Sequence, residues 1–100
     1  EGTLEVQTGG NIYLRNNARI ILNGIDAELV LKGGIHIEED SHSSITSSSE
    51  ALFEISIIGP SASINIENGA ELLIQGCNNI NFSEGAQCFF HGDGTLKIID

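Results

Sequence analysis

The chain has 100 residues, 40% of them hydrophobic, and a formal net charge of -10 at pH 7. That length suits one domain with its own core, and no apolar run approaches the roughly 18 residues of a membrane-spanning helix. Lys and Arg together number 4, so the chain lacks the basic surface that binds phosphate backbones. We therefore expect neither nucleic acid nor a membrane interior as a partner.

A five-residue phrase, small-x-apolar-x-apolar, recurs along the whole chain. In order, its twelve copies read GTLEV, GNIYL, ARIIL, AELVL, GGIHI, SSITS, ALFEI, ASINI, AELLI, NNINF, AQCFF and GTLKI. They occupy residues 2–6, 10–14, 18–22, 27–31, 33–37, 43–47, 51–55, 62–66, 70–74, 78–82, 86–90 and 94–98. Most copies start eight residues after the previous one, and the departures lie between Ala18 and Ala62. The weakest copy is SSITS, whose second apolar position is Ser47.

Each phrase has the pattern of a short, half-buried β-strand. Its apolar residues alternate, which places them on one face of an extended chain, and isoleucine, valine and phenylalanine are common among them. Gly, Asn, Asp or Ser occurs within three residues after each phrase, as expected of tight corners. So short an apolar run does not support a helix.

The longer period predicts the architecture. If three strands make one coil, the coils start at Gly2, Ala27, Ala51 and Asn78, about 25 residues apart. This spacing predicts an all-β fold, a three-sided parallel β-solenoid with about four coils and twelve short strands. The whole chain, residues 1–100, would form one domain without capping segments. Two alternatives are two-sided coils of about 16 residues and an antiparallel sandwich.

In this arrangement the two apolar side chains of each phrase point into the solenoid, and the small residue lies near a corner. The residues between them point outward and stack in columns along the three faces. The predicted outward columns are Glu5, Val30, Glu54 and Asn81; Tyr13, His36, Asn65 and Phe89; and Ile21, Thr46, Leu73 and Lys97.

The repeat pattern resembles the β-solenoid segments of bacterial surface adhesins, autotransporter passengers and phage tailspikes. The resemblance extends from Gly2 to Ile98 and lies in the spacing of the phrases, with no diagnostic motif. It implies a fold and an extracellular or cell-surface location, and it implies an activity less directly.

The outward columns contain no pair of carboxylates at equivalent positions of neighbouring coils, so we expect no catalytic residues and no enzyme. Five residues of the segment IHIEEDSH have side chains of metal-binding types, namely His36, Glu38, Glu39, Asp40 and His42. No other coil repeats its spacing, so a solvated acidic corner is the preferred interpretation. We expect no metal and no cofactor.

The ends of the chain carry the phrase almost to the last residue, which would leave the terminal coils open. A second copy placed after the first would continue the eight-residue spacing, since its Gly2 would follow Gly94 by eight. We expect each open end to pair with the next copy. The predicted assembly residues are Leu4, Val6, Ile12, Leu14, Cys88, Phe90, Leu96 and Ile98.

The sequence thus predicts a structural protein that assembles head to tail into an extracellular or cell-surface filament. Outward Ile21 and Leu73 are candidates for lateral contact between solenoids. The alternative function is a glycan-binding or host-binding segment of a longer adhesin or tailspike. Its candidate surface is the column of Tyr13, His36, Asn65 and Phe89, because aromatic and amide groups suit sugars.

Overall fold

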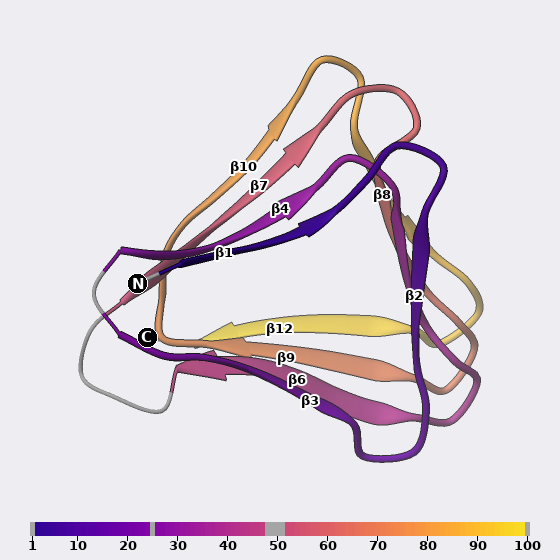
Figure 1. Ribbon diagram of the computed structural model, residues 1–100. Helices are drawn as coiled ribbons and strands as arrows, with labels where there is room; N and C mark the ends of the chain where they lie inside the picture. Colours follow the sequence, from indigo (N-terminus) through magenta and orange to yellow (C-terminus); the bar gives the residue numbers. More distant parts are fainter. Residues whose placement is uncertain (1, 25, 48–51, 100) are drawn as a thin grey trace.

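The computed structural model describes residues 2–24, 26–47 and 52–99. In these residues, twelve strands form three parallel sheets of four strands each. Figure 1 shows the sheets as the three sides of a triangle, with consecutive strands passing from side to side. Each coil contributes one strand to each sheet, and we number the coils 1 to 4 from the N-terminus. The predicted three-sided parallel β-solenoid is confirmed.

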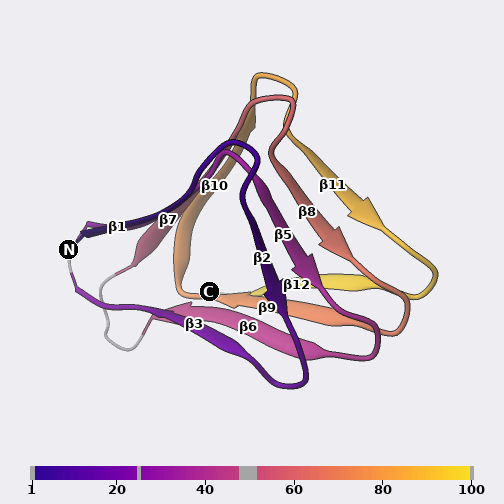
Figure 2. The same cartoon turned by 45° about the vertical axis from the view of Figure 1, so that its right-hand side comes forward.

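The strands of each sheet follow one another along the axis of the solenoid (Figure 2). The first sheet contains β1 (Gly2–Val6), β4 (Ala27–Leu31), β7 (Phe53–Ile58) and β10 (Cys77–Ser83). The second sheet contains β2 (Asn11–Leu14), β5 (Gly34–Ile37), β8 (Ser63–Ile66) and β11 (Gln87–Phe90). The third sheet contains β3 (Arg19–Leu22), β6 (His42–Ser47), β9 (Glu71–Gln75) and β12 (Thr95–Ile99). The described residues hold no helix of the length and hydrophobicity that crossing a membrane requires.

Inward side chains stack in columns because each strand pairs in register with its equivalent in the next coil. One column of the third sheet consists of isoleucine alone, namely Ile20, Ile45, Ile74 and Ile98. In coils 2 and 3 the inward isoleucines are almost completely buried, as Ile45 at 1% and Ile74 at 0% exposure illustrate. Each such side chain stabilises the fold by about 1.5 to 3 kcal/mol relative to an exposed one.

The corner between the second and third sheets has the same closing hydrogen bond in all four coils. A backbone N–H donates to the carbonyl three residues earlier, as in a β-turn. The donor and acceptor residues are Ala18 and Arg15, Ser41 and Glu38, Ala70 and Glu67, and Gly94 and His91, at 2.9 to 3.2 Å. One residue of each corner has positive φ, and these are Asn16, Asp40, Gly69 and Gly92. Asn, Asp and Gly tolerate this conformation best.

Coil 2 shortens the corner between the first and second sheets, which explains the six-residue interval from Ala27 to Gly33. Here the N–H groups of Lys32 and Gly33 both donate to the Val6 carbonyl of coil 1, at 2.8 and 3.1 Å. A Cβ atom at Gly33 would collide with the Gly10 carbonyl oxygen. This close approach requires glycine, as expected for the small position of the phrase.

The predicted outward column of the first sheet is wrong at Glu54. Val30 pairs with Ser56, and Glu54 pairs with Glu28 instead. The phrase ALFEI in coil 3 is therefore displaced by two residues from the observed strand pairing. Its start, Ala51, lies outside the described residues, and β7 begins at Phe53 with inward side chains at Phe53, Ile55 and Ile57. The cause is that Phe53 occupies a position that the phrase assigns to a small residue.

The predicted outward column of the third sheet is wrong at Leu73. Ile21 pairs with Thr46, but Thr46 pairs with Gln75, whereas Leu73 pairs with Ser44 and Lys97. The ambiguity comes from serine in coil 2, because serine fits both the small and the inward positions. Ser41 closes the corner of this coil, and Ser43, assigned to the small position, points inward beside Leu72.

Ser43 is a polar residue in the apolar column of the third sheet. It is 2% exposed, and its hydroxyl has no hydrogen-bond partner among the described residues. A buried hydroxyl without a partner destabilises the fold.

Replacing Ser43→Ala should therefore raise the free energy of unfolding by about 1 kcal/mol. Urea denaturation at low protein concentration measures this change as a higher midpoint with an unchanged slope. Ser44→Ala, on the outward side of the same strand, is the matched control and should change stability by less than about 0.5 kcal/mol. A less stable Ser43→Ala variant would contradict the assignment of an unpaired hydroxyl.

Candidate functional site

The outer face of the second sheet carries the column Tyr13, His36, Asn65 and Phe89, as predicted. Tyr13 pairs with His36, His36 with Asn65, and Asn65 with Phe89. The rings of Tyr13 and His36 are stacked, with centroids 4.7 Å apart and an angle of 15° between their planes. This separation matches the spacing of about 4.8 Å between neighbouring strands. The sheet itself therefore sets the aromatic stack.

Hydrogen bonds hold the middle of this column in place. Nε2 of His36 lies 2.8 Å from Oδ1 of Asn11, an acceptor, so the ring donates through Nε2–H. The amide of Asn65 donates to Oγ of Ser63 at 2.8 Å and to the Ile35 carbonyl at 3.4 Å. The polar side chains are thus oriented along the sheet, and both end members of the column are aromatic.

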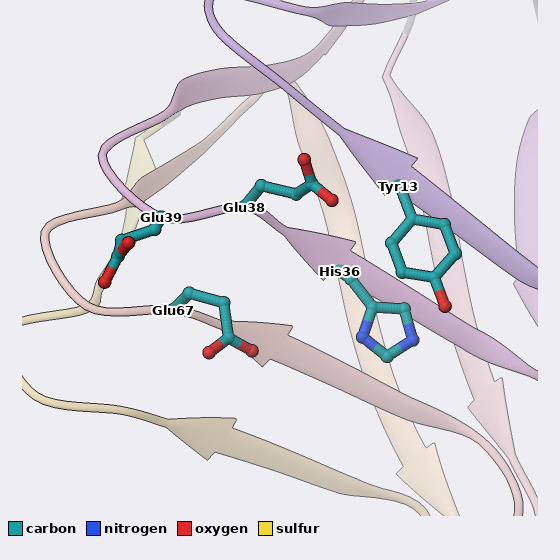
Figure 3. Close-up of a pocket in the computed structure, with 5 residues that line it drawn as sticks. All are labelled: Tyr13, His36, Glu38, Glu39 and Glu67. Atoms are coloured by element: carbon teal, nitrogen blue, oxygen red, sulfur yellow. The ribbon is translucent and has the colours of Figure 1, made fainter.

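A hollow of about 370 Å³ lies beside the stack, at the corner that follows the second sheet. Figure 3 shows Tyr13 and His36 on one side of it and carboxylates on the other. The lining residues are Tyr13, His36, Glu38, Glu39 and Glu67. Three carboxylates beside an aromatic wall suit a neutral or cationic polar ligand, because carboxylates accept hydrogen bonds from hydroxyl and amine groups. An anionic ligand would be repelled.

Two of these carboxylates lie beside basic side chains of a neighbouring coil, and the contact with His91 is an ion pair only when that histidine is protonated. Nε of Arg15 lies 2.6 Å from Oε1 of Glu38, and Nε2 of His91 lies 3.9 Å from Oε2 of Glu67. Each pair joins neighbouring coils, as does Lys32 with Glu5 in coils 2 and 1. These groups are partly exposed to solvent, so each pair contributes at most about 1 kcal/mol.

The expectation that no carboxylates occupy equivalent positions in neighbouring coils is wrong. Glu28 pairs directly with Glu54, and Oε2 of Glu28 accepts a hydrogen bond of 3.2 Å from Ser56 Oγ. The corner residues Glu38 and Glu67 also follow equivalent strands in coils 2 and 3. The two-residue displacement of the phrase ALFEI hid the pair of Glu28 and Glu54. The pair of Glu38 and Glu67 was missed because the predicted outward columns did not include corner residues.

The candidate metal ligands of the segment IHIEEDSH lie around a corner from one another. His36 is on the second sheet, whereas His42 is on the third, with Nδ1 3.6 Å from Oε1 of Glu71. Within the described residues, no group of three His, Cys, Asp or Glu side chains is placed to hold a metal ion.

The two end faces of the solenoid form a second candidate site. We define the N-terminal end face as coil 1 (β1, β2 and β3) and the C-terminal end face as coil 4 (β10, β11 and β12). Several inward side chains are exposed here at positions that are buried in coils 2 and 3, most of them in coil 4. Phe90 is 52% exposed, whereas Ile66 of the same column is 0% exposed. Leu4 is 41% exposed, whereas its neighbour Leu29 is 0% exposed.

All eight predicted assembly residues lie in the two end faces. Phe90 and Ile98 are the most exposed, while Val6 and Leu14 are each 6% exposed and the others lie between. The assembly residues predicted from the sequence did not include Phe82, an inward residue of β10 that is 43% exposed. The phrase NNINF contains this residue at its second apolar position and could have identified it.

Both cysteines are free thiols in coil 4 and are half-buried. Burial raises the pKa of Cys88, which continues the inward column of Ile64. Burial also raises the pKa of Cys77, whose thiol contacts the Asn79 carbonyl at 3.1 Å. Both thiols therefore carry less thiolate at neutral pH than an ordinary cysteine and react more slowly with alkylating reagents.

The two candidate residues for lateral contact lie on the third sheet in different columns. Ile21 is 46% exposed and shares its column with Ile99 at the opposite end, 39% exposed. Leu73 is half-buried in the neighbouring column, between Ser44 and Lys97. Thr46 and Gln75 separate Ile21 from Ile99, and Leu73 has only polar neighbours in its column.

The sheets, the end faces and the hollow define the chain as a parallel β-solenoid with two candidate surfaces. No protein-family model, no curated protein and no solved structure was found to match it. Its functional hypotheses rest on the end faces and on the outer face of the second sheet.

The stack of Tyr13 on His36 predicts a distinct magnetic environment for the His36 ring. Its ring protons should resonate upfield of those of His42 and His91, which lie beside carboxylates and serve as internal references. Tyr13→Leu should remove this upfield displacement, and Tyr13→Phe should keep it, because only the ring is required. An unchanged His36 spectrum in Tyr13→Leu would show that the two rings do not stack in solution.

Proposed function

We propose that this chain is a non-enzymatic structural protein that stacks head to tail into a filament through its end faces. The observation that carries the proposal is the exposure of inward apolar side chains at both ends. Ile98, for example, is 55% exposed, whereas Ile74 directly next to it is 0% exposed. A further coil placed on this end face would bury Ile98 as Ile74 is buried.

Unpaired strand edges support the same proposal. Among the described strands, β10, β11 and β12 each have a partner on one side, and so do β1, β2 and β3 at the other end. Their outer edges present rows of N–H and C=O groups that pair readily with another parallel strand. A second copy offers three strands in matching order, with 5, 4 and 4 residues in β1, β2 and β3 against 7, 4 and 5 in β10, β11 and β12. Four coils spaced by about 4.8 Å give an axial rise of about 19 Å per copy.

The distribution of charge also favours contact between opposite ends. In coil 1, Arg15 and Arg19 outweigh Glu5, so residues 2–24 carry a formal charge of +1. In coil 4, residues 77–99 carry -1, since Glu84 and Asp93 outweigh Lys97. Residues 25–76 between them carry -8. With Glu1 counted, residues 1–24 are neutral. The repulsive charge is thus concentrated away from the end faces, so little repulsion opposes contact between opposite ends.

A structural role agrees with the contacts that two carboxylates of the hollow make with basic side chains. Glu38 faces Arg15 and Glu67 faces His91, so each already has a basic neighbour. The support for a location outside the cell or on its surface is the resemblance of the repeat pattern to adhesin, autotransporter and tailspike solenoids.

The test compares two lysine substitutions on the third sheet. Ile98→Lys places a charge in the C-terminal end face, whereas Leu73→Lys places the same charge on the outer side of coil 3. Because burial of an isoleucine contributes about 1.5 to 3 kcal/mol, Ile98→Lys should weaken end-to-end association at least about tenfold. Sedimentation velocity over a concentration series measures this, and negative-stain imaging measures filament length and width.

The unaltered chain should form filaments with an axial repeat near 19 Å. Leu73→Lys should leave filament length unchanged, and any lateral association through Leu73 would appear as a change in width only. Circular dichroism shows whether each variant keeps its β-structure. A chain that stays monomeric at all concentrations, or an Ile98→Lys variant that assembles normally, would refute the proposal.

The hollow beside Tyr13 and His36 favours a second candidate function, glycan binding on the outer face of the second sheet. Its aromatic wall offers a flat apolar surface, and its carboxylates accept hydrogen bonds from sugar hydroxyls. Titration with neutral oligosaccharides should move the His36 resonances but not those of His42, and Tyr13→Leu should abolish the response. Absence of a response to any oligosaccharide tested argues against this function, and cleavage of the sugar would contradict the non-enzymatic assignment.

A further inference from the structure

We propose that the second sheet sets the register of the junction between copies, with Phe89 of one copy stacked on Tyr13 of the next. This inference rests on the proposed head-to-tail assembly and specifies its contact. In this register, inward Cys88 and Phe90 of one copy lie against Ile12 and Leu14 of the next.

The second sheet is the part of the solenoid whose register is the most regular. Its phrases start at Gly10, Gly33, Ala62 and Ala86, and its four strands pair residue for residue in that alignment. The first sheet has a register shift between Cys77 and Asn79, in the strand that would meet the next copy.

The third sheet is less regular. In coil 1 the corner closes at Ala18 and in coil 2 it closes at Ser41, but the pairing of Arg19 with Ser44 places Ala18 beside Ser43, two residues further along. The pairing of Ser43 with Leu72 then places the start of one phrase two residues past the start of the next, Ala70. In the second sheet the phrases and the pairing agree throughout.

Both ends of the outward column on the second sheet are aromatic and open. Tyr13, at the N-terminal end face, is 55% exposed, and Phe89, at the C-terminal end face, is 42% exposed. Tyr13 already stacks on His36 at 4.7 Å inside the chain, which is about one strand spacing. A following copy in the same register places Tyr13 one strand spacing from Phe89, where offset stacking of two aromatic rings is favourable.

The contact extends the internal column into a continuous one. Along the filament the order would be Tyr13, His36, Asn65 and Phe89, followed by Tyr13 of the next copy. A slip of two residues in either direction would instead place Phe89 against Asn11 or Arg15 and lose the aromatic pair. The two rings thus make the junction specific for one register, which backbone pairing alone does not.

The experiment traps the register by disulfide cross-linking of the full chain. Cys77→Ala first removes one native thiol and leaves Cys88 in place. In this background, Ile12→Cys places a thiol directly opposite Cys88 of the preceding copy in the inferred register, at a separation that a disulfide can span, and keeps both Tyr13 and Phe89. Leu14→Cys in the same background is the matched control for a two-residue slip. Filaments are treated with a mild oxidant and analysed on denaturing, non-reducing gels.

The expected result is a ladder of covalent oligomers for the Ile12→Cys variant, with at least tenfold less for the Leu14→Cys variant. Separately, Phe89→Ala in the native chain should weaken association about tenfold, and Phe89→Tyr should restore it. Asn81→Ala, an outward change on another sheet of coil 4, should leave association unchanged.

The outcomes separate this inference from the proposal on which it rests. Filaments that cross-link in the Leu14→Cys variant but not in the Ile12→Cys variant would overturn the register and leave head-to-tail stacking intact. Filaments unaffected by Phe89→Ala would overturn the aromatic contact in the same way. A native chain that forms no filaments would overturn both.

Discussion

Each coil of this solenoid buries its inward side chains only against the coils on either side of it. The triangular coil is too small to form a core alone, and the large apolar side chains that are less than 2% exposed all lie in coils 2 and 3, which have a neighbouring coil on both sides. Ile57 in coil 3 is 0% exposed, whereas Phe82 beside it in coil 4 is 43% exposed, although both point inward. Burial thus depends on position along the axis more than on residue type.

The interior also accommodates residues that break the repeat, at places where neighbouring side chains are small or neighbouring strands are few. Small residues on the third sheet leave room for the ring of Phe53, which is 1% exposed. A side chain built at Gly76 would contact both Ser47 and Phe53. The register shift between Cys77 and Asn79 lies in the next strand of the same sheet, where fewer neighbours enforce the pairing. Irregularity in this molecule is therefore concentrated at one corner and near one end.

The spacing of the phrases was sufficient to predict the three-sided fold and the whole second sheet, because every corner beside that sheet keeps a small residue in step with the pairing. It failed at Glu54 because Phe53 occupies a position that the phrase assigns to a small residue. It failed at Leu73 because serine in coil 2 fits both the small and the inward positions of the phrase. It also missed the hollow, whose walls Glu38, Glu39 and Glu67 are corner residues. Only the stacking of successive corners brings these carboxylates together, and strand periodicity contains no information on that.

The two proposed functions place opposite demands on Tyr13. In a filament with the inferred register, Phe89 of the neighbouring copy covers the face of Tyr13 that His36 leaves open, so a sugar ring has no access to it. Only the copy at the N-terminal tip of the filament would keep an open Tyr13, together with the carboxylates of its hollow. Glycan binding by this face would therefore be a property of the tip or of the free chain. Assembly would convert the ring from a binding surface into part of the junction.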